Sequence, residues 1–288
     1  MSAAPAVNAQ GPLAIICGGG SLPVAVADSV SASGRGVLLF PLRGAADPQA
    51  VARHPHHWLY VGQGGKFRRL ARAAGCTDVV LIGSMVRPAL RHIRPDFTTL
   101  FYLPRIITAY RGGDDHLLSS IARIFDEHGF HLVGAHEVAP EILMPAGPLG
   151  EALPSAADRA DIALGLEYLR AAAPFDIGQA VVVAGRHVLA VEAAEGTDAM
   201  LARVADMRGK KRVPPAAGVL VKAPKHGQDH RFDLPSIGPQ TVEAAARAGL
   251  SGIAVVAGST IVAEAEALIA AASRARLFVI GVAAETRQ

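Results

Sequence analysis

Short apolar runs that end in glycine-rich turns alternate with helical patterns along the first half of the chain. Leu13–Cys17 is a continuous apolar run, which is typical of a strand buried on both faces of a sheet. Glycines at positions 18–20 follow it, and a helical pattern then runs as far as Gly34. Further strands are expected at 36–42, 58–61 and 78–82, with a helix at 67–74. This alternation predicts a parallel, Rossmann-like sheet with right-handed crossovers.

Three loops follow the predicted strands, at Gly18–Ser21, Gly62–Lys66 and Gly83–Arg87. Ligands of parallel sheets bind beyond the carboxyl ends of the strands, and bare N–H groups at a helix start can hold phosphate. The loops therefore favour a phosphate or nucleotide site, although the first also fits a simple tight turn. A dinucleotide fingerprint is not met, because Pro23 stands where the third glycine belongs. The lysine at 66 is not followed by Ser or Thr, so the loop is no P-loop either.

Composition narrows the class of protein. The chain has 288 residues, 51% of them hydrophobic, and a formal net charge of +3 without a long basic block, so a nucleic-acid tail is not expected. Cys17 and Cys76 have no metal-ligand spacing and read as buried thiols in a reducing compartment. No signal peptide or long apolar span is visible. We expect a cytoplasmic protein and leave open a peripheral contact with the inner membrane.

The second half predicts another α/β domain with a mixed sheet. Residues 130–154 are rich in proline and glycine and read as a linker between an N-terminal domain, 11–129, and a C-terminal domain, 155–288. Ser155 and Asp158 have capping-box spacing at the start of a helix, and runs at 180–183 and 188–192 flank a turn as in a hairpin. In the linker, residues 142–144 either line an apolar cleft or pack against a domain.

Two clusters of charged residues are candidates for chemistry. Asp114 and Asp115 precede a helical pattern, where they can cap the helix, bind a ligand hydroxyl or hold a metal. Between positions 222 and 235, two lysines, an arginine and two aspartates stand in a turn-rich segment that follows an apolar strand. Carboxylates beside cations suit a phosphorylated ligand, with or without a divalent metal. The alternatives are a solvated loop with incidental ion pairs, a surface position for Lys222 and a capping role for Asp233.

Taken together, the motifs resemble the LpxI family, the UDP-2,3-diacylglucosamine diphosphatases of Gram-negative lipid A synthesis. The resemblance runs from Leu13 to Val282, and the set is specific although each piece alone is weak. The motifs are Gly18-Gly19-Gly20-x-Leu22-Pro23, Gly62-Gln63-x-Gly65-Lys66, Gly83-x-x-x-Arg87-Pro88, Gly113-Asp114-Asp115, Glu195-Gly196-Thr197-Asp198 and Lys222-x-x-Lys225-x-Gly227-Gln228-Asp229-x-Arg231-x-Asp233-x-Pro235-x-Ile237-Gly238.

The resemblance implies two α/β domains joined by a linker, with the lipid substrate between them. It implies a homodimeric hydrolase that splits the UDP-sugar into UMP and 2,3-diacylglucosamine 1-phosphate (lipid X), with water attacking the β-phosphorus. It also implies a divalent cation, Mg²⁺ or another such as Mn²⁺, and an essential aspartate in the second domain. Either Asp229 or Asp233 fits that aspartate, and we carry both as metal ligands.

The residues expected at the site follow from these motifs. Catalytic roles are expected for Asp229, Asp233, Lys225, Arg231 and Lys222, the cations being partners of the diphosphate. Substrate contacts are expected from Gly19, Gly20, Ser21, Gln63, Lys66, Arg87, Asp114, Thr197, Asp198 and Gln228. A non-catalytic carrier of nucleotide-sugars or lipids is the main alternative, although a carrier gains little from two carboxylates near a polyanion. A nucleotide-dependent oxidoreductase is disfavoured by Pro23.

Overall fold

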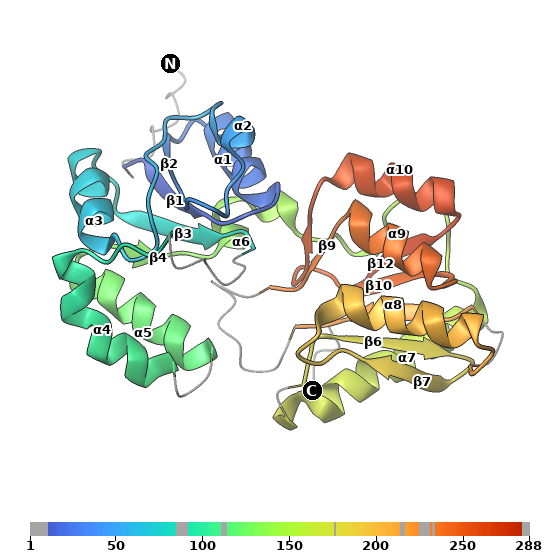
Figure 1. Cartoon of the computed structure of the whole chain (residues 1–288). Helices are drawn as coiled ribbons and strands as arrows, with labels where there is room; N and C mark the ends of the chain where they lie inside the picture. The colour runs from blue at the N-terminus through green and yellow to red at the C-terminus, as the bar shows by residue number, and fades with distance from the viewer. Residues whose placement is uncertain are drawn as a thin grey trace, which may run out of the picture. The chain divides into compact units, whose positions relative to one another are not determined.

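The structure is a computed structural model of the chain, and it describes residues 11–84, 92–110, 114–175, 177–213, 217–224, 231 and 234–283. The chain divides into two compact units (Figure 1). The first ends at Pro140 and also includes Arg231, while the second begins at Glu141. Both units are α/β, as the sequence predicts.

The first unit is built on a four-stranded parallel sheet of order β2-β1-β3-β4. Its strands are β1 (Leu13–Cys17), β2 (Val37–Pro41), β3 (Asp78–Ile82) and β4 (His131–Leu132). The strand residues of β1 are almost entirely buried, which accounts for the unbroken apolar run in the sequence. This confirms the prediction of a parallel sheet.

Helices cover both faces of this sheet. Its helices are α1 (Leu22–Ala32), α2 (Pro48–Val51), α3 (Gly64–Ala73), α4 (Phe97–Tyr110), α5 (Asp114–Glu127) and α6 (Ala135–Val138). α1 and α6 contact the strands on one face. α3 and α5 bury Phe67, Ala71 and Ala122 against the other, together with Phe40 and Phe130 (Figure 1).

Two parts of the first unit differ from the sequence prediction. The segment 58–61 forms isolated bridges, such as Leu59 with Leu42, rather than a regular strand. It follows the edge of β2 closely, and the Leu59 N–H donates to the Pro41 carbonyl at 2.9 Å. The second difference is α4, which was not predicted. It carries Pro104 in its interior, a residue that normally argues against a helix.

The second unit is built on a mixed six-stranded sheet of order β5-β12-β10-β8-β6-β7. Its strands are β5 (Gly147–Pro148), β6 (Ala180–Ala184), β7 (His187–Val191), β8 (Val219–Lys222), β10 (Gly252–Val256) and β12 (Phe278–Val282). β8, β10 and β12 are parallel, whereas β6, β7 and β5 pair antiparallel. The mixed sheet and its hairpin are therefore confirmed. A separate parallel pair is formed by β9 (Ser236–Ile237) and β11 (Ile261–Val262).

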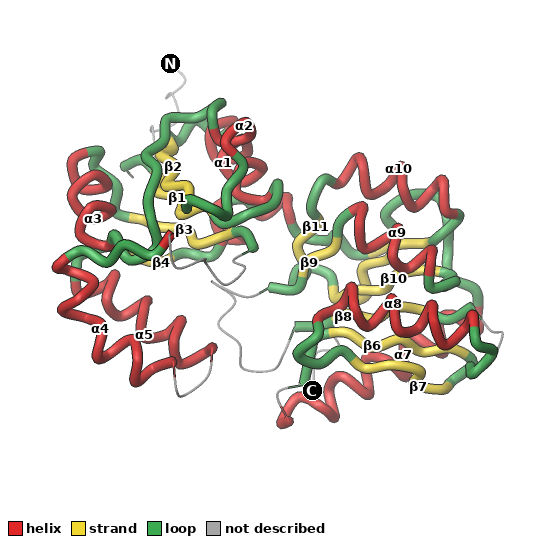
Figure 2. Tube along the Cα trace, viewed as in Figure 1, coloured by secondary structure: helices red, strands yellow, loops and turns green. Residues whose placement is uncertain are grey.

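The helices of the second unit form a layer on each side of its sheet (Figure 2). They are α7 (Ala156–Ala172), α8 (Gly196–Gly209), α9 (Pro239–Arg247) and α10 (Ala265–Ala275), with short 3₁₀ turns at Pro140–Ile142 and Ala173–Phe175. α8, α9 and α10 bury one face of the strands, and α7 buries the other through Ile162 and Leu169. The Ser155–Asp158 capping box forms at the start of α7, as predicted.

The stretch 130–154, predicted to be a linker, contains a short strand of each sheet. β4 pairs with β3 of the first unit, and β5 pairs with β12 of the second. Each strand is only two residues long, so neither produces a periodic pattern in the sequence. Within the described residues, no helix has the length and apolar character needed to cross a membrane.

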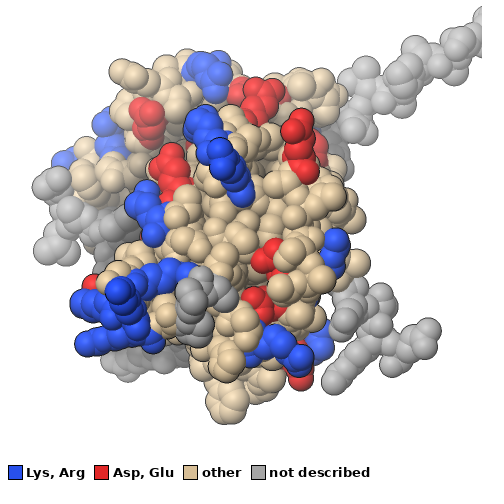
Figure 3. All heavy atoms as spheres, turned by 90° about the vertical axis from the view of Figure 1, so that its right-hand side faces the viewer, with Lys and Arg blue, Asp and Glu red and all other residues tan. Residues whose placement is uncertain are grey.

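Both cysteines of the chain lie in the first unit, and both are buried thiols. Cys17 ends β1, where burial raises the pKa of its thiol to about 12. Burial also raises the pKa of Cys76, with a smaller opposing effect from Arg35. The surface carries mixed charge: on the face shown in Figure 3, basic and acidic side chains are interspersed among uncharged ones.

Candidate functional site

A polar hollow lies at the carboxyl end of β8 in the second unit. Its volume is about 310 Å³. It is lined by Gly178, Gln179, Glu192, Ala193, Lys222, Leu234, Pro235 and Ser236. Lys222, the last residue of β8, is only 7% exposed, so it is not the surface strand residue that was the alternative interpretation. Its Nζ donates to the Ser236 carbonyl at 3.0 Å. A buried ammonium in a hollow of this kind is well suited to an anionic ligand.

Glu192 shares this hollow with Lys222 and connects it to a second predicted residue. Its carboxylate accepts a hydrogen bond from the Gln179 N–H at 2.8 Å and another from the Thr197 Oγ1 at 2.7 Å. Sequence reasoning missed Glu192, because a glutamate at the end of a strand carries no pattern of its own. Its position beside Lys222 gives the hollow both a cation and a carboxylate, which suits a ligand with a phosphate and hydroxyl groups.

From the sequence, Thr197 is also a candidate N-cap of the helical pattern that follows it. The structure shows that this capping role is wrong. α8 begins at Gly196 with Glu195 as its N-cap residue, and no side chain caps it there. Thr197 lies within the first turn, and its hydroxyl is directed to Glu192 instead. Asp198 is also in that turn, where a carboxylate stabilises the positive end of the helix. The Glu195–Asp198 motif therefore brings Thr197 to the polar hollow through Glu192.

Much of the charged segment 222–235 lies outside the described residues. Asp229, Asp233, Lys225 and Gln228 are among these positions. Arg87, another expected site residue, also lies outside the described residues. Arg231 is described, and its Nη1 donates to the Leu132 carbonyl at 3.4 Å within the first unit. No group of three or more His, Cys, Asp and Glu side chains able to hold a metal occurs among the described residues. The predicted metal ligands are therefore not among the residues whose geometry is seen.

The first glycine loop is closely packed against the loop that follows β3. The Gly19 N–H donates to the Ser84 carbonyl at 2.8 Å, and the Ser84 N–H donates back to Gly19 at 2.9 Å. A Cβ atom at Gly19 would lie 2.9 Å from Ser84 Oγ, closer than real contacts allow. The Gly19 N–H is therefore used within the fold, as expected if this loop is a simple tight turn. Gly20 has a φ of +87° with open space around it, and Ser21 precedes α1 as its N-cap residue.

The Gly62–Lys66 motif is likewise bound into its own unit. Gln63 Oε1 accepts from the Tyr60 N–H at 3.0 Å, and Lys66 Nζ donates to the Trp58 carbonyl at 2.9 Å. A Cβ atom at Gly65 would lie 2.6 Å from Thr98 Oγ1 and 2.9 Å from Asp96 Oδ2, so a larger residue would displace these side chains where α3 meets α4. These contacts give the motif a clear structural role.

Asp96 joins the N-termini of α3 and α4 and was not predicted. Its Oδ2 accepts from the Lys66 N–H at 3.0 Å, and its Oδ1 accepts from the Thr99 N–H at 3.0 Å. Burial acts to raise the pKa of Asp96, but the hydrogen bonds from Thr99, Lys66 and Gly65 outweigh it and lower the pKa overall. One carboxylate therefore caps two helices.

The structure also locates Asp114 and the stretch 142–144. Asp114 is the first residue of α5, and its side chain lies outside the described part of the chain. In the stretch 142–144, Met144 is 1% exposed and belongs to the core of the second unit, and Ile142 is also buried. Packing against a domain, one of the two interpretations offered for this stretch, is thus what the structure shows.

The fold defines an α/β protein of two units, with a polar hollow at a strand end of the second. Comparison with models of known families identifies one family along both units. The family model of the LpxI N-terminal domain matches residues 12–142, and that of the LpxI C-terminal domain matches residues 145–280. The chain belongs to the LpxI family.

A curated relative supports the same assignment along the whole chain. UDP-2,3-diacylglucosamine pyrophosphatase LpxI of Caulobacter vibrioides is 45% identical over 281 residues, which cover 96% of this chain and 99% of that protein. The relationship thus includes both units and the segment between them.

Proposed function

We propose that this chain hydrolyses the diphosphate of UDP-2,3-diacylglucosamine in lipid A synthesis. The observation that carries the proposal is the 45% identity to a pyrophosphatase of that name over 96% of the chain. Water attacks the β-phosphorus, the bond from that phosphorus to the bridging oxygen breaks, and UMP leaves. The other product, 2,3-diacylglucosamine 1-phosphate, keeps the oxygen that came from water.

The polar hollow supports the proposal through its chemistry. Negative charge is shared among the phosphoryl oxygens in the transition state, and a buried cation stabilises it more than a solvated one does. Lys222 is such a cation, and we assign it to the diphosphate. Lys225 and Arg231 are proposed as further partners of these oxygens. Glu192 and Thr197 are proposed to bind sugar hydroxyls.

Metal assistance is part of the proposal. Asp229 and Asp233 are the proposed ligands of Mg²⁺ or another divalent cation, because Mg²⁺ binds through one or two carboxylates and substrate phosphates. When bound, the ion would neutralise charge on the diphosphate. The protein's own contribution is to hold the diphosphate and to orient the attacking water.

The direct test is incubation of the protein with UDP-2,3-diacylglucosamine in the presence of Mg²⁺ or EDTA. We expect UMP and lipid X with Mg²⁺ and neither with EDTA. Asp229→Ala and Asp233→Ala should abolish turnover while substrate binding is largely retained. Asp206→Ala is the matched control, because Asp206 of α8 forms a surface ion pair with Lys210, the residue that follows the helix. Binding without any turnover by the wild-type protein would favour the carrier alternative, and full activity of both active-site variants would refute the residue assignment.

We also propose a cytoplasmic protein in peripheral contact with the membrane through the outer face of α4. Phe97 and Phe101 are 92% and 78% exposed, and Leu100, Leu103 and Ile107 are exposed as well. Residues 97–110 include no acidic side chain, so the face carries no charge that an anionic membrane would repel. Large exposed apolar groups of this kind mark interaction sites, and the proposed substrate is a lipid.

Sedimentation with vesicles of phosphatidylethanolamine and phosphatidylglycerol tests this contact. Phe97→Ser and Phe101→Ser together should reduce vesicle binding, whereas Phe175→Ser should not. Phe175 is a suitable control because it is 75% exposed and lies in the second unit. If the double variant instead converts a dimer to a monomer without affecting vesicle binding, α4 covers a second copy of the chain and not the membrane.

A further inference from the structure

A second polar hollow lies in the first unit, beyond the carboxyl end of β2. Its volume is about 540 Å³, within the range of about 300–1,000 Å³ that is usual for small-molecule sites. β2 ends at Pro41, so the hollow lies at the edge of a parallel sheet where ligands usually bind. It is lined by Arg43, Gly44, Ala46, Pro48, Trp58, Tyr60 and His92.

Backbone hydrogen bonds bring three separate segments of the chain together around this hollow. The Arg43 N–H donates to the Leu59 carbonyl at 2.9 Å, which joins the loop after β2 to the segment 58–61. The Val61 N–H donates to the His92 carbonyl at 3.0 Å, which joins a third segment to the same stretch. The lining side chains are therefore positioned by the fold, although they are distant in sequence.

Arg43 gives the hollow a positive charge beside two aromatic rings. Its guanidinium carbon lies 5.4 Å from the ring centroid of Trp58 and 5.4 Å from that of Tyr60, within cation–π range. A guanidinium that lies over aromatic rings can still donate its N–H groups to a phosphate. Among the described residues, no carboxylate forms an ion pair with Arg43. The nearby Asp47 instead caps α2, where it accepts from the Gln49 N–H at 2.9 Å.

Glycines allow the loops around the hollow to approach closely. Gly44 has a φ of +85°, and a Cβ atom there would overlap the His92 ring. A Cβ atom at Gly19 would lie 3.0 Å from the Ala45 carbonyl oxygen, so the glycine loop after β1 lies against the loop after β2. The glycine-rich turn that the sequence marks as a candidate phosphate or nucleotide loop is thus a neighbour of this hollow.

The groups in the lining fit one class of ligand best. Aromatic rings stack on nucleobases of any kind, and arginine binds phosphate. In nucleotide-binding sheets, an arginine close to the end of the second strand can accommodate a phosphate on the ribose. A divalent metal prefers several carboxylates or imidazoles, and this lining contains one imidazole and no carboxylate. A bare phosphate would leave the rings of Trp58 and Tyr60 unused.

We propose that this hollow binds a nucleotide, with the phosphate at Arg43 and the base against Trp58 and Tyr60. All the residues of the site belong to the first unit, so the proposal does not depend on the hydrolysis proposed above. Two sources of such a ligand can be distinguished by experiment. One is the UMP that the proposed reaction releases, and the other is a free nucleotide of any base.

Trp58 is the single tryptophan of the chain, so its fluorescence reports on the hollow directly. UMP and AMP added to the full-length protein should each quench it saturably. Uridine lacks the phosphate and should bind at least about tenfold more weakly, as loss of a hydrogen bond to a charged group predicts. Glucose 1-phosphate and inorganic phosphate should compete with UMP only weakly. If either competes as well as UMP itself, the base contributes nothing and the nucleotide assignment is overturned.

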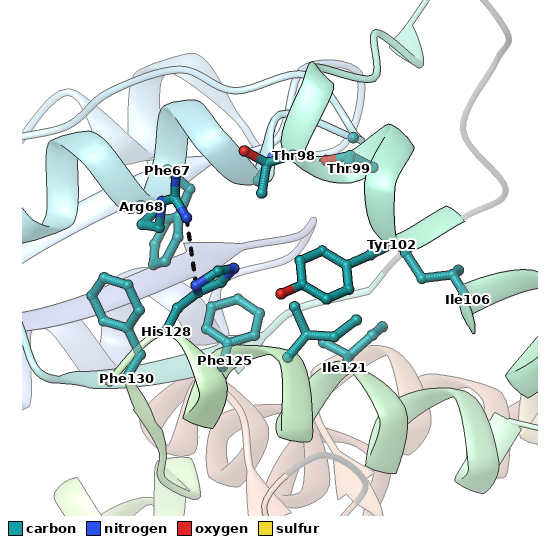
Figure 4. A pocket seen from close by; sticks show the side chains of 13 residues that line it. Phe67, Arg68, Thr98, Thr99, Tyr102, Ile106, Ile121, Phe125, His128 and Phe130 are labelled. Atoms are coloured by element: carbon teal, nitrogen blue, oxygen red, sulfur yellow. Dashed lines mark hydrogen bonds between the residues drawn. The ribbon is translucent and has the colours of Figure 1, made fainter. Parts of the chain in front are cut away.

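Two arginines of the first unit provide a matched pair of variants. Arg43→Met removes the charge and should raise the Kd for UMP at least about tenfold. Arg68→Met is the control, because Arg68 lines a different cavity between α3, α4 and α5, of about 190 Å³, where its Nη1 lies 3.5 Å from the His128 Nδ1 (Figure 4). Its Kd should be unaltered. A loss of affinity in Arg68→Met alone would move the nucleotide to that cavity and overturn the proposal. Thermal unfolding shows whether each variant is folded.

Equilibrium dialysis with radiolabelled UMP gives a readout that does not rely on fluorescence. Trp58→Leu and Tyr60→Leu each remove one aromatic ring, and each should raise the Kd about fivefold or more, the lower end of the range for base stacking. Phe101→Leu is the control, because Phe101 is an aromatic residue of the same unit that is 78% exposed and does not line the hollow. An unaltered Kd in both ring variants would refute the contact with the base.

The source of the nucleotide follows from the same titrations. UMP that binds at least about tenfold more tightly than AMP would identify the product of the proposed reaction, since stacking alone does not discriminate between bases. Equal affinities would identify a free nucleotide of any base. The two proposals also fail separately. A protein that releases UMP from the UDP-sugar but shows no quenching contradicts the nucleotide site alone, whereas quenching without any hydrolysis contradicts only the proposed reaction.

Discussion

The two units use the polar residues at their strand ends in different ways. In the first, Gln63 and Lys66 bind backbone groups of neighbouring loops, and Asp96 caps two helices. In the second, Lys222 and Glu192 line a polar hollow. Similar residue types near strand ends thus hold the fold together in one unit and line an open hollow in the other. The position of a motif at the ligand-binding edge of a sheet does not by itself distinguish these roles.

The largest expected effect tests the second half of this comparison. Lys222→Met keeps the length of the side chain and removes its charge, so it should fold and should lower kcat/KM about 10²- to 10³-fold, as loss of one transition-state donor does. Release of UMP measures the effect. Lys210→Met, at the exposed C-cap position of α8, is the control and should retain full activity. If Lys222→Met keeps activity within about twofold of wild type, the assignment of Lys222 to the site is wrong.

The next effect concerns the double cap in the first unit. Asp96→Ala removes caps from α3 and α4, each worth about 1 kcal/mol, so unfolding in urea should show a loss of about 2 kcal/mol. Asp47→Ala provides a comparison, because Asp47 caps only the four-residue α2 through the Gln49 N–H. Its loss should be about half as large. Equal losses for the two variants would contradict the shared cap.

The same carboxylate predicts a pH dependence. Because the pKa of Asp96 is lowered in the folded state from the ordinary 3.8, its stabilisation is complete above that value and is lost as pH falls through the lower, folded pKa. The difference in free energy of unfolding between wild type and Asp96→Asn should therefore be constant near neutral pH and shrink in acid. Urea titrations at several pH values measure it, and a difference that grows in acid would contradict the assignment.

The smallest effects belong to the glycine-lysine motif of the first unit. Lys66→Met and Gln63→Ala each lose a single hydrogen bond to the backbone, so each should lower the free energy of unfolding by about 1 kcal/mol. Because these bonds lie within the fold, kcat/KM should stay within about threefold of wild type. If kcat/KM falls by more than the loss of stability explains, these residues contact the substrate. The two units would then not differ in how they use such residues.

The sequence predicted the fold well where apolar patterns decide it. Leu13–Cys17 and the 180–191 hairpin follow directly from buried runs and turns. The sequence missed α4, since Pro104 argues against a helix and the exposed Phe97 and Phe101 blur its periodicity. It also could not distinguish a strand from the isolated bridges at 58–61, because both are extended and apolar.

The candidate site was predictable only in part. Lys222 and Thr197 came from motifs, and the structure connects both to the polar hollow. Glu192 could not be singled out, because its role depends on neighbours that are distant in sequence. It shares the hollow with Lys222 only after β6 and β8 have paired.

The placement of the two thiols gives the molecule a built-in reporter. Cys17 and Cys76 are the only cysteines of the chain, and both are buried in the first unit. A thiol reagent will therefore label the protein only when that unit opens, however stable the second unit is. Labelling rates with and without an added ligand would therefore record the opening of the first unit alone.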